Sequence, residues 1–248
     1  MATDILEINW FDHIFVILVG IVIPAMSLIS GSMTDDKSYQ LPPKKHLYFT
    51  NGLVLIIGAL LVLSSWNIGK KPWETLGFVL PDVNPIVIWS TTVLVFLYLG
   101  DSFLSLRSIK KNQEDFQQMS HIVPLNWKEY LPYVFLAFSA GICEEIIYRG
   151  FLIPYISYYL PVWEFSFLIA IIIPGIIFAV SHYYQGTWSV VKIFFISILF
   201  GLIFFHSGSL LIVVIIHILI DLISGIMGVL VFKNLEKEKT KKANNNSL

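Results

Sequence analysis

The chain has 248 residues, of which 56% are hydrophobic and only 13% are charged, and its formal net charge is −1. The charged share is about half that of a soluble globular protein, and a mean hydropathy of +0.75 is typical of a membrane protein. A net charge near zero argues against nucleic acid as a partner. We therefore expect the lipid bilayer to be the main environment of this chain.

Apolar stretches of membrane-spanning length recur along the sequence. A helix needs about 20 apolar residues to cross a bilayer, and an open strand leaves its backbone unsatisfied in lipid. We predict an all-α polytopic membrane protein with about seven transmembrane helices, or eight if the longest stretch divides into two. The expected segments are Phe11–Ser30, Tyr48–Trp66, Pro85–Leu106, Tyr130–Leu160, Trp163–His182, Trp188–Phe205 and Leu210–Phe232.

Polar segments and composition suggest three parts. Residues 1–130 hold N-terminal transmembrane helices and the polar loops Gly31–His46 and Arg107–Glu129. Residues 131–232 form a membrane core that carries most of the polar groups at membrane depth. Residues 233–248 are rich in Lys and Asn and are predicted to be a disordered cytoplasmic tail. No internal repeat is visible, which weighs against the duplicated transporter architectures.

The distribution of Lys and Arg predicts the orientation, because these residues gather in cytoplasmic loops. Seven crossings place nearly all of them on the side of the C-terminus, which is then cytoplasmic, in the cell membrane if the chain is bacterial. That side has Lys37, Lys44, Lys45, Arg107, Lys110, Lys111, Lys128, Lys192 and the tail lysines, and the other has only Lys70 and Lys71. The segment from Lys70 to Phe78 is predicted to lie at the interface, with Trp73 at headgroup level.

A cluster of charges lies where lipid is expected: Glu144-Glu145-Ile-Ile-Tyr148-Arg149. Each charge at membrane depth costs a few kcal/mol on insertion scales. Glu145 and Arg149 are four residues apart and share a helix face, so an ion pair would neutralise both. Glu144 points about 100° around the helix and lacks that partner. It is a candidate general base or acid; the alternative is a hydrogen-bonded structural acid.

Further polar groups lie in later apolar segments. His182 ends one of them, where an interface or capping role is the alternative to chemistry. His217 and Asp221 share a helix face, as a functional pair or as two polar groups that neutralise each other. His206 is expected to be a solvated loop residue. Cys143 has no neighbouring His in the sequence and is a weak candidate nucleophile.

Known motifs of other intramembrane proteases are missing from the sequence. The one Gly-Asp dipeptide, Gly100-Asp101, has no second aspartyl motif with which to form a catalytic pair, and there is no Gly-x-Ser-x-Gly and no His-Glu-x-x-His. These absences argue against presenilin-like, rhomboid-like and site-2-type proteases respectively.

Three motifs in order resemble the CPBP family, which comprises the CAAX-prenyl-protease-2-like and bacteriocin-processing membrane proteins and is also called the ABI family. They are Glu144-Glu-x-x-x-Arg149, Phe178-x-x-x-His182, and Gly208-Ser-Leu followed by His217-x-x-x-Asp221. The resemblance covers roughly Leu131–Met227, and Leu76-Gly77-Phe78 is similar to an upstream element of the family.

The resemblance implies an intramembrane endopeptidase, with its catalytic cavity in the C-terminal helical core, that hydrolyses a membrane-associated protein or peptide. It implies that Glu144 and His182 activate a water and that His217 and Asp221 bind the oxyanion. Glu145, Arg149, Phe178 and Tyr148 would support the site. Prenyl-protease members typically have Asn where this chain has Asp221. An ionised Asp cannot donate a hydrogen bond, so Asp221 is protonated, orients His217 or ligates a metal.

Alternatives remain open at this point. The reaction needs no metal if Glu144 is the base, or it uses a divalent metal such as zinc held by Glu144, His182, His217 and Asp221. The chain could instead be a non-catalytic immunity or scaffold protein with the same fold, or a proton-coupled transporter. The predicted topology also separates His182, near the cytoplasmic end of its helix, from His217, about 12 Å from the outer end of its own. Their meeting requires tilted helices or a helix that begins deep in the membrane.

Overall fold

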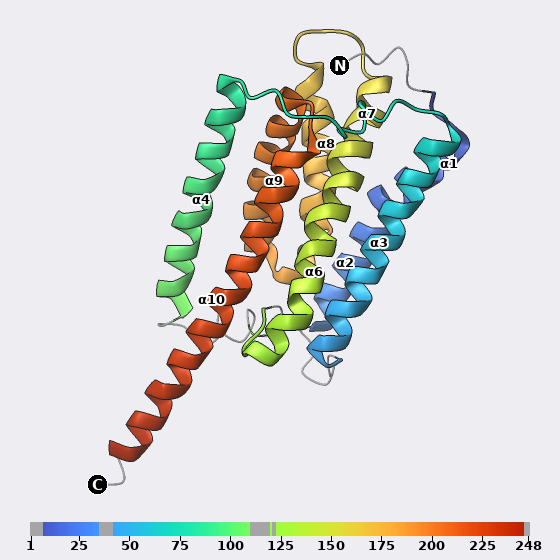
Figure 1. Cartoon of the computed structure of the whole chain (residues 1–248). Coiled ribbons are helices and arrows are strands. Elements are labelled where there is room, and N and C mark those ends of the chain that lie inside the picture. Colours follow the sequence, from blue (N-terminus) through green and yellow to red (C-terminus); the bar gives the residue numbers. More distant parts are fainter. Residues whose placement is uncertain (1–6, 35–41, 110–119, 121–122, 246–248) are drawn as a thin grey trace.

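The computed structural model describes residues 7–34, 42–109, 120 and 123–245. The described part is a bundle of helices without strands (Figure 1). Its elements are α1 (Trp10–Ile17), the π-helical turn η2 (Leu18–Val22), α2 (Ile23–Thr34), α3 (Lys44–Ile68), α4 (Pro85–Ile109), α6 (Trp127–Glu145), the π-helical segment η3 (Ile146–Leu152), α7 (Ile153–Tyr159), α8 (Ser166–Val180), the 3₁₀ turn η4 (Tyr183–Gln185), α9 (Thr187–Ser207) and α10 (Leu210–Asn245).

The structure confirms an all-α polytopic membrane fold. Among the described residues, six helical runs are long and apolar enough to cross a membrane: Trp10–Ser30, Lys44–Ile68, Pro85–Leu104, Trp127–Tyr159, Thr187–Ser207 and Leu210–Leu235. The expected stretch Tyr130–Leu160 is not two elements, because α6, η3 and α7 continue into one another as a single run of 33 residues.

The fifth predicted crossing, Trp163–His182, is shorter than expected. Only Ser166–Val180 is helical, which is 15 residues or about 22 Å at 1.5 Å per residue. The bilayer core is about 30 Å thick, so α8 is too short to cross it upright. Trp163 and Phe165 precede the helix, and Ser181 and His182 follow it as turn residues. Figure 1 shows the turn between α8 and α9 partway along the bundle, above the lower ends of α3 and α6.

The run of α6 and η3 lies at the centre of the bundle. It packs against α3 and α10, while α8 packs on α9 and α4 on α9. At the edge of the bundle, α4 is tied to α9 by an ion pair between Lys192 Nζ and Asp101 Oδ1 (3.1 Å). The Tyr98 hydroxyl donates to the Ile220 carbonyl of α10 (3.2 Å). The central helix is therefore the element on which side chains from several others meet.

The segment between α3 and α4 closes one end of the bundle. Leu76 is fully buried, and Leu210 N–H, which begins α10, donates to the Gly77 carbonyl (3.0 Å). Gly77 has φ +93°, and a Cβ there would lie 2.6 Å from Phe204. Only glycine fits both the conformation and the space.

A buried ion pair holds the start of the same segment. Lys71 is 3% exposed and pairs with Asp12 of α1, which also accepts from the Ser65 hydroxyl (2.6 Å). The ammonium lies 4.9 Å from the centre of the Trp66 ring. Lys71 is thus an internal tether rather than the interfacial residue that the sequence suggests.

The last helix is longer than predicted. α10 runs to Asn245 and so covers most of the segment 233–248 for which the composition predicts disorder. Lys and Glu are good helix formers, and a helix already formed by its membrane part only has to be extended, which avoids the cost of nucleation. The expected loops Gly31–His46 and Arg107–Glu129 lie partly outside the described residues.

Candidate active site

Arg149 is a buried side chain of the site that has contacts on several sides. Its NH1 donates to Glu145 Oε1 (2.8 Å), which is the ion pair that the sequence predicts, and its NH2 donates to Ser197 Oγ of α9 (2.9 Å). The guanidinium carbon lies 4.8 Å from the centre of the Phe178 ring and 5.1 Å from that of Phe200. Cation–π contacts in a water-poor site add to the ion pair, so Arg149 is fixed on all sides.

His217 connects the buried pair to the open part of the site. Its Nδ1 lies 2.7 Å from Glu145 Oε1. Its Nε2 lies 3.7 Å from Glu144 Oε2 and 3.7 Å from Asp221 Oδ2. The side chain of Glu145 is fully buried, whereas those of His217, Glu144 and Asp221 are 11%, 12% and 27% exposed. The imidazole therefore has a buried side and a side that faces two accessible acids.

A close approach of two helices makes this contact possible. A Cβ on Gly141 of α6 would lie 2.5 Å from Ile218 Cγ1 and 2.9 Å from the Ile218 backbone nitrogen. Ile218 follows His217 on α10, and Gly141 is one turn before Glu145 on α6. The missing side chain lets the backbone of α10 approach α6, which brings His217 within hydrogen-bond distance of Glu145.

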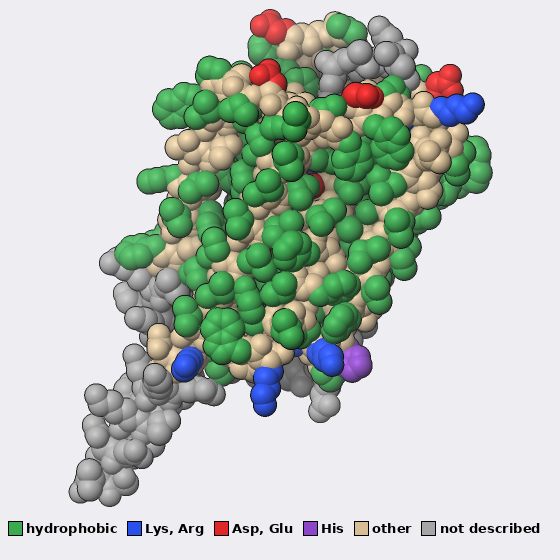
Figure 2. Space-filling view, in the orientation of Figure 1, with side chains coloured by type: hydrophobic (Ala, Val, Ile, Leu, Met, Phe, Trp, Pro, Cys, Tyr) green, Lys and Arg blue, Asp and Glu red, His purple; other side chains and the backbone are tan. Residues whose placement is uncertain are grey.

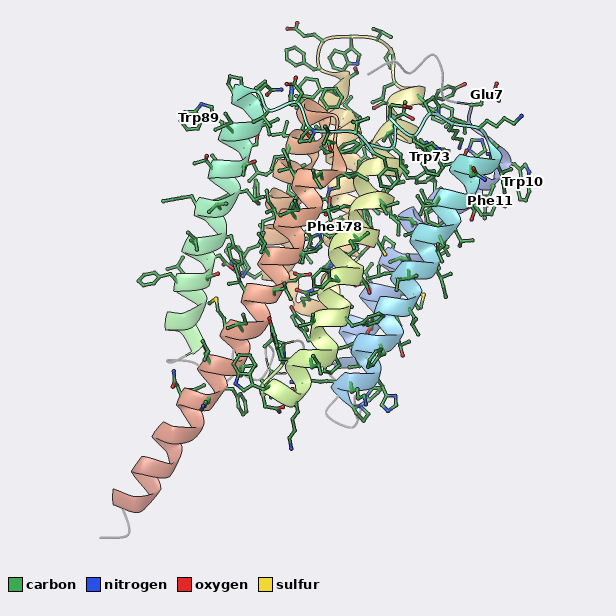
Figure 3. The ribbon with its side chains drawn as sticks, viewed as in Figure 1. Glu7, Trp10, Phe11, Trp73, Trp89 and Phe178 are labelled. Atoms are coloured by element: carbon green, nitrogen blue, oxygen red, sulfur yellow. The ribbon has the colours of Figure 1, made fainter. Side chains whose placement is uncertain are left out.

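His182 reaches the same cluster from the end of α8. Its Nδ1 lies 2.8 Å from the Phe178 carbonyl oxygen, and the Phe178 ring lies between the helices in the middle of the bundle (Figure 3). The Phe178 ring lies between the two histidines, with its centroid 4.5 Å from that of His182 and 6.4 Å from that of His217. The early end of α8 resolves the difference in depth between the two histidines, because the helix stops partway along the bundle (Figure 1).

Tyr148, which we expect to support the site, packs against the same residues. The Tyr148 hydroxyl donates to Ser181 Oγ (3.4 Å), and its ring stands edge-on to Phe178 at 4.8 Å. All seven residues of η3 are buried. Short π-helical segments are common at functional sites, and here η3 begins directly after the two glutamates.

Several residues of the site escaped prediction from the sequence. Ser197 and Phe200 contact Arg149 from α9, while the Tyr184 ring stacks on that of His182. Tyr133 donates to the backbone carbonyl of Asp221 (3.2 Å). Only Tyr184 carried a signal, since it stands two residues after His182; the others depend on helix packing.

His206 and Cys143 were expected to have no role or only a weak one in the chemistry. His206 is part of the last turn of α9 rather than of a loop, because the helix continues to Ser207 and is capped by Gly208 at φ +69°. Its ring stands edge-on to Phe167 at 5.8 Å. Cys143 is buried as a free thiol.

The His and carboxylate side chains of the site are the groups that could bind a metal ion. Among the described residues, no three His, Cys, Asp or Glu side chains are grouped so as to hold a metal ion. Each histidine of the site commits one ring nitrogen to a protein acceptor. We therefore derive no step through a metal.

The fold and the site together define a polytopic α-helical membrane protein with a polar centre built by α6, α8 and α10. Residues 126–223 match the family model described as Rce1-like, type II CAAX prenyl endopeptidase Rce1-like. This match confirms the resemblance to CPBP-family intramembrane proteases that the three motifs predict. No curated protein and no solved structure matches the chain.

Proposed function

We propose that this chain is an intramembrane endopeptidase that hydrolyses one peptide bond of a membrane-associated protein or peptide. The observation that carries the proposal is the position of His217, with Nδ1 on Glu145 and Nε2 toward Glu144 and Asp221. The family match supports a CAAX-type endopeptidase at the level of the family. The substrate and the roles of the individual residues in hydrolysis are our own assignments.

The hydrogen-bond partner of each imidazole determines which ring nitrogen donates a hydrogen bond and which accepts one. A backbone carbonyl only accepts, so Nδ1 of His182 carries the hydrogen and its Nε2 presents a lone pair when the ring is neutral. Glu145 Oε1 accepts from Arg149 and also from His217 Nδ1. Nε2 of His217 therefore donates only when the ring is cationic, and a cation is favourable beside the carboxylates of Glu144, Glu145 and Asp221.

The reaction follows from these assignments. Glu144 removes a proton from a water that His182 Nε2 holds by accepting its other hydrogen. The water oxygen bonds to the carbonyl carbon, and the carbonyl oxygen becomes an oxyanion that accepts from His217 Nε2–H. As the C–N bond breaks, Glu144 returns the proton to the leaving nitrogen. Asp221 stabilises the charge on His217, and Arg149 holds Glu145 in place.

Replacing Glu144 tests the proposal. We expect Glu144→Gln to lower cleavage by about 10²–10⁴-fold, the usual contribution of a general acid or base, because an amide accepts no proton from water. Cleavage is measured with a fluorogenic prenylated CAAX peptide, and the same peptide without its lipid, in proteoliposomes. Glu164→Gln is the matched control, because Glu164 lies exposed in the turn before α8.

The outcomes separate the candidate functions. Equal thermal unfolding of both variants in detergent shows that folding is intact. Unchanged cleavage by Glu144→Gln contradicts the assigned base. A biological activity that survives in this variant without cleavage favours the non-catalytic immunity or scaffold protein instead. Repeating the assay with a chelator tests the zinc alternative, and our mechanism expects cleavage to persist.

A further inference from the structure

We propose that Tyr184 is a substrate-contacting residue of this site and that its hydroxyl donates a hydrogen bond to a backbone carbonyl of the bound peptide, next to the bond that is cut. The inference rests on the proposed endopeptidase function and adds a residue that none of the three family motifs contains.

The backbone holds Tyr184 beside the site. It is the middle residue of η4, the turn that follows His182, and Gly186 ends this turn at φ +96°. Tyr184 N–H donates to Ser27 Oγ of α2 (3.4 Å). The Tyr184 ring is stacked on His182 with 6.0 Å between centroids and 28° between planes. The turn therefore presents this side chain in a fixed direction.

Tyr184 is more accessible than the acids of the cluster. It is 40% exposed, whereas the side chains of Glu144 and Asp221 are 12% and 27% exposed. Tyr184 thus lies beside His182, one of the proposed reacting groups, and at the more exposed edge of the cluster, where it can contact a bound peptide.

The hydrogen-bond partners of three tyrosines near the site differ. The Tyr148 hydroxyl donates to Ser181 and the Tyr133 hydroxyl donates to the Asp221 carbonyl. The Tyr184 hydroxyl accepts from Gln185 Nε2 (3.1 Å), and this bond leaves its own hydrogen available. Among these three phenols, it is the one whose proton the described protein groups do not take up.

A bound peptide needs such a donor. Its carbonyl groups require donors, and the proposed mechanism already uses the hydrogen on His217 Nε2. A phenol donates without adding charge at membrane depth. Leaving a buried carbonyl unpaired would weaken binding, so a donor at this position favours the peptide in the orientation for cleavage.

The experiment compares Tyr184→Phe with Tyr183→Phe, its neighbour in the same turn. Phe keeps the ring on His182 and removes only the hydroxyl. Binding is measured with the prenylated CAAX peptide and chains that also carry Glu144→Gln, so that no cleavage occurs. We expect Tyr184→Phe to weaken binding about threefold to tenfold, the range of one neutral hydrogen bond, and Tyr183→Phe to leave it unchanged.

A thioamide scan of the peptide identifies the acceptor. Replacing one carbonyl oxygen at a time by sulfur, a weaker acceptor, should reduce binding to the Tyr184 chain at one position and not to Tyr184→Phe. Binding and cleavage by Tyr184→Phe equal to those of the unsubstituted chain would overturn the inference and leave the endopeptidase intact. Equal losses in both Phe variants, or no coupled position, would also overturn it. A chain that binds no peptide would overturn both proposals.

Discussion

Asp221 is the residue at which this chain departs from the prenyl-protease pattern of the family. Its Oδ2 lies 3.7 Å from His217 Nε2, and its side chain is 27% exposed. A carboxylate at this position can stabilise a cationic imidazole but donates no hydrogen bond when ionised. In our mechanism His217 therefore donates to the oxyanion, and Asp221 acts through His217.

This assignment predicts different results for two substitutions of Asp221. We expect Asp221→Asn to keep cleavage within about tenfold of the unsubstituted chain, because the amide can itself donate to the oxyanion. We expect Asp221→Ala to lower kcat by about tenfold to a hundredfold, or about 1.4–2.7 kcal/mol, because it removes the carboxylate that lies 3.7 Å from His217 Nε2 and stabilises the cationic imidazole. Initial rates with the fluorogenic peptide measure both. Equal losses in the two variants would show that only the negative charge matters.

Residue spacing predicted part of this site. The four-residue intervals gave the Glu145–Arg149 pair and placed His217 and Asp221 on one face, because helix geometry is local. The contact between Glu145 and His217 joins residues 72 positions apart, so it depends on how α6 and α10 pack. Ser197 was missed for the same reason. One carboxylate oxygen that accepts from both an arginine and a histidine has no local sequence signature.

At the scale of elements, the packing of α6 on α10 determines the geometry of the site. Gly141 has no room for a Cβ, since its nearest neighbours include the backbone nitrogen of Ile218 at 2.9 Å. A side chain at this position must push α10 away and lengthen the distance from Glu145 to His217.

We expect Gly141→Ala to destabilise the protein by about 1–3 kcal/mol, the usual cost of overpacking, and to reduce cleavage. Gly100→Ala is the matched control, because Gly100 is also helical and a Cβ there would meet nothing within 4 Å. Thermal unfolding in detergent and cleavage of the peptide are measured on both. Normal cleavage by Gly141→Ala would contradict the link between this helix contact and the site.

The elements themselves were largely predictable, because apolar stretches of membrane length correspond to helices. The residues at which the helices end were harder to predict. The stretch Trp163–His182 is apolar enough for a crossing, yet α8 has only 15 residues. Hydropathy measures whether a residue tolerates lipid, and it contains no information on where a turn begins. The end of α8 is determined by the turn at Ser181 and His182 and by the hydrogen bond from the following turn to Ser27 of α2. That early end places His182 against the Phe178 ring, which also faces His217.

At the scale of the whole molecule, the two ends of the bundle carry different side chains. On the face shown in Figure 2, hydrophobic side chains cover the middle, most Lys and Arg lie at the lower end and most Asp and Glu at the upper end. α3 and α6 begin at the lower end with Lys44, Lys45 and Lys128. Trp10, Trp73 and Trp89 mark the upper end (Figure 3), as expected of aromatic side chains at headgroup depth.

This asymmetry predicts the orientation in the membrane. Lysines remain on the cytoplasmic side, so the beginnings of α3 and α6 should face the cytoplasm and the turn between α7 and α8 should lie outside. Two single substitutions report on the two ends: Lys45→Cys, at an exposed residue that begins α3, and Val162→Cys, in the exposed turn before α8. The native thiol, Cys143, is buried and gives a low background with a membrane-impermeant maleimide.

We expect Val162→Cys to react with the maleimide in intact cells and Lys45→Cys to react only after the membrane is permeabilised. The short α8 makes the experiment informative beyond orientation. If α8 and α9 together span the membrane and return, Val162 and Ser207 lie on the same side. Leu80→Cys, at an exposed residue of the segment whose Asp82 N–H donates to the Ser207 carbonyl, should then be labelled in intact cells like Val162→Cys. Labelling of Lys45→Cys in intact cells would reverse the orientation. The site would then open toward the opposite compartment, and a cytoplasmic CAAX tail would no longer be a suitable substrate.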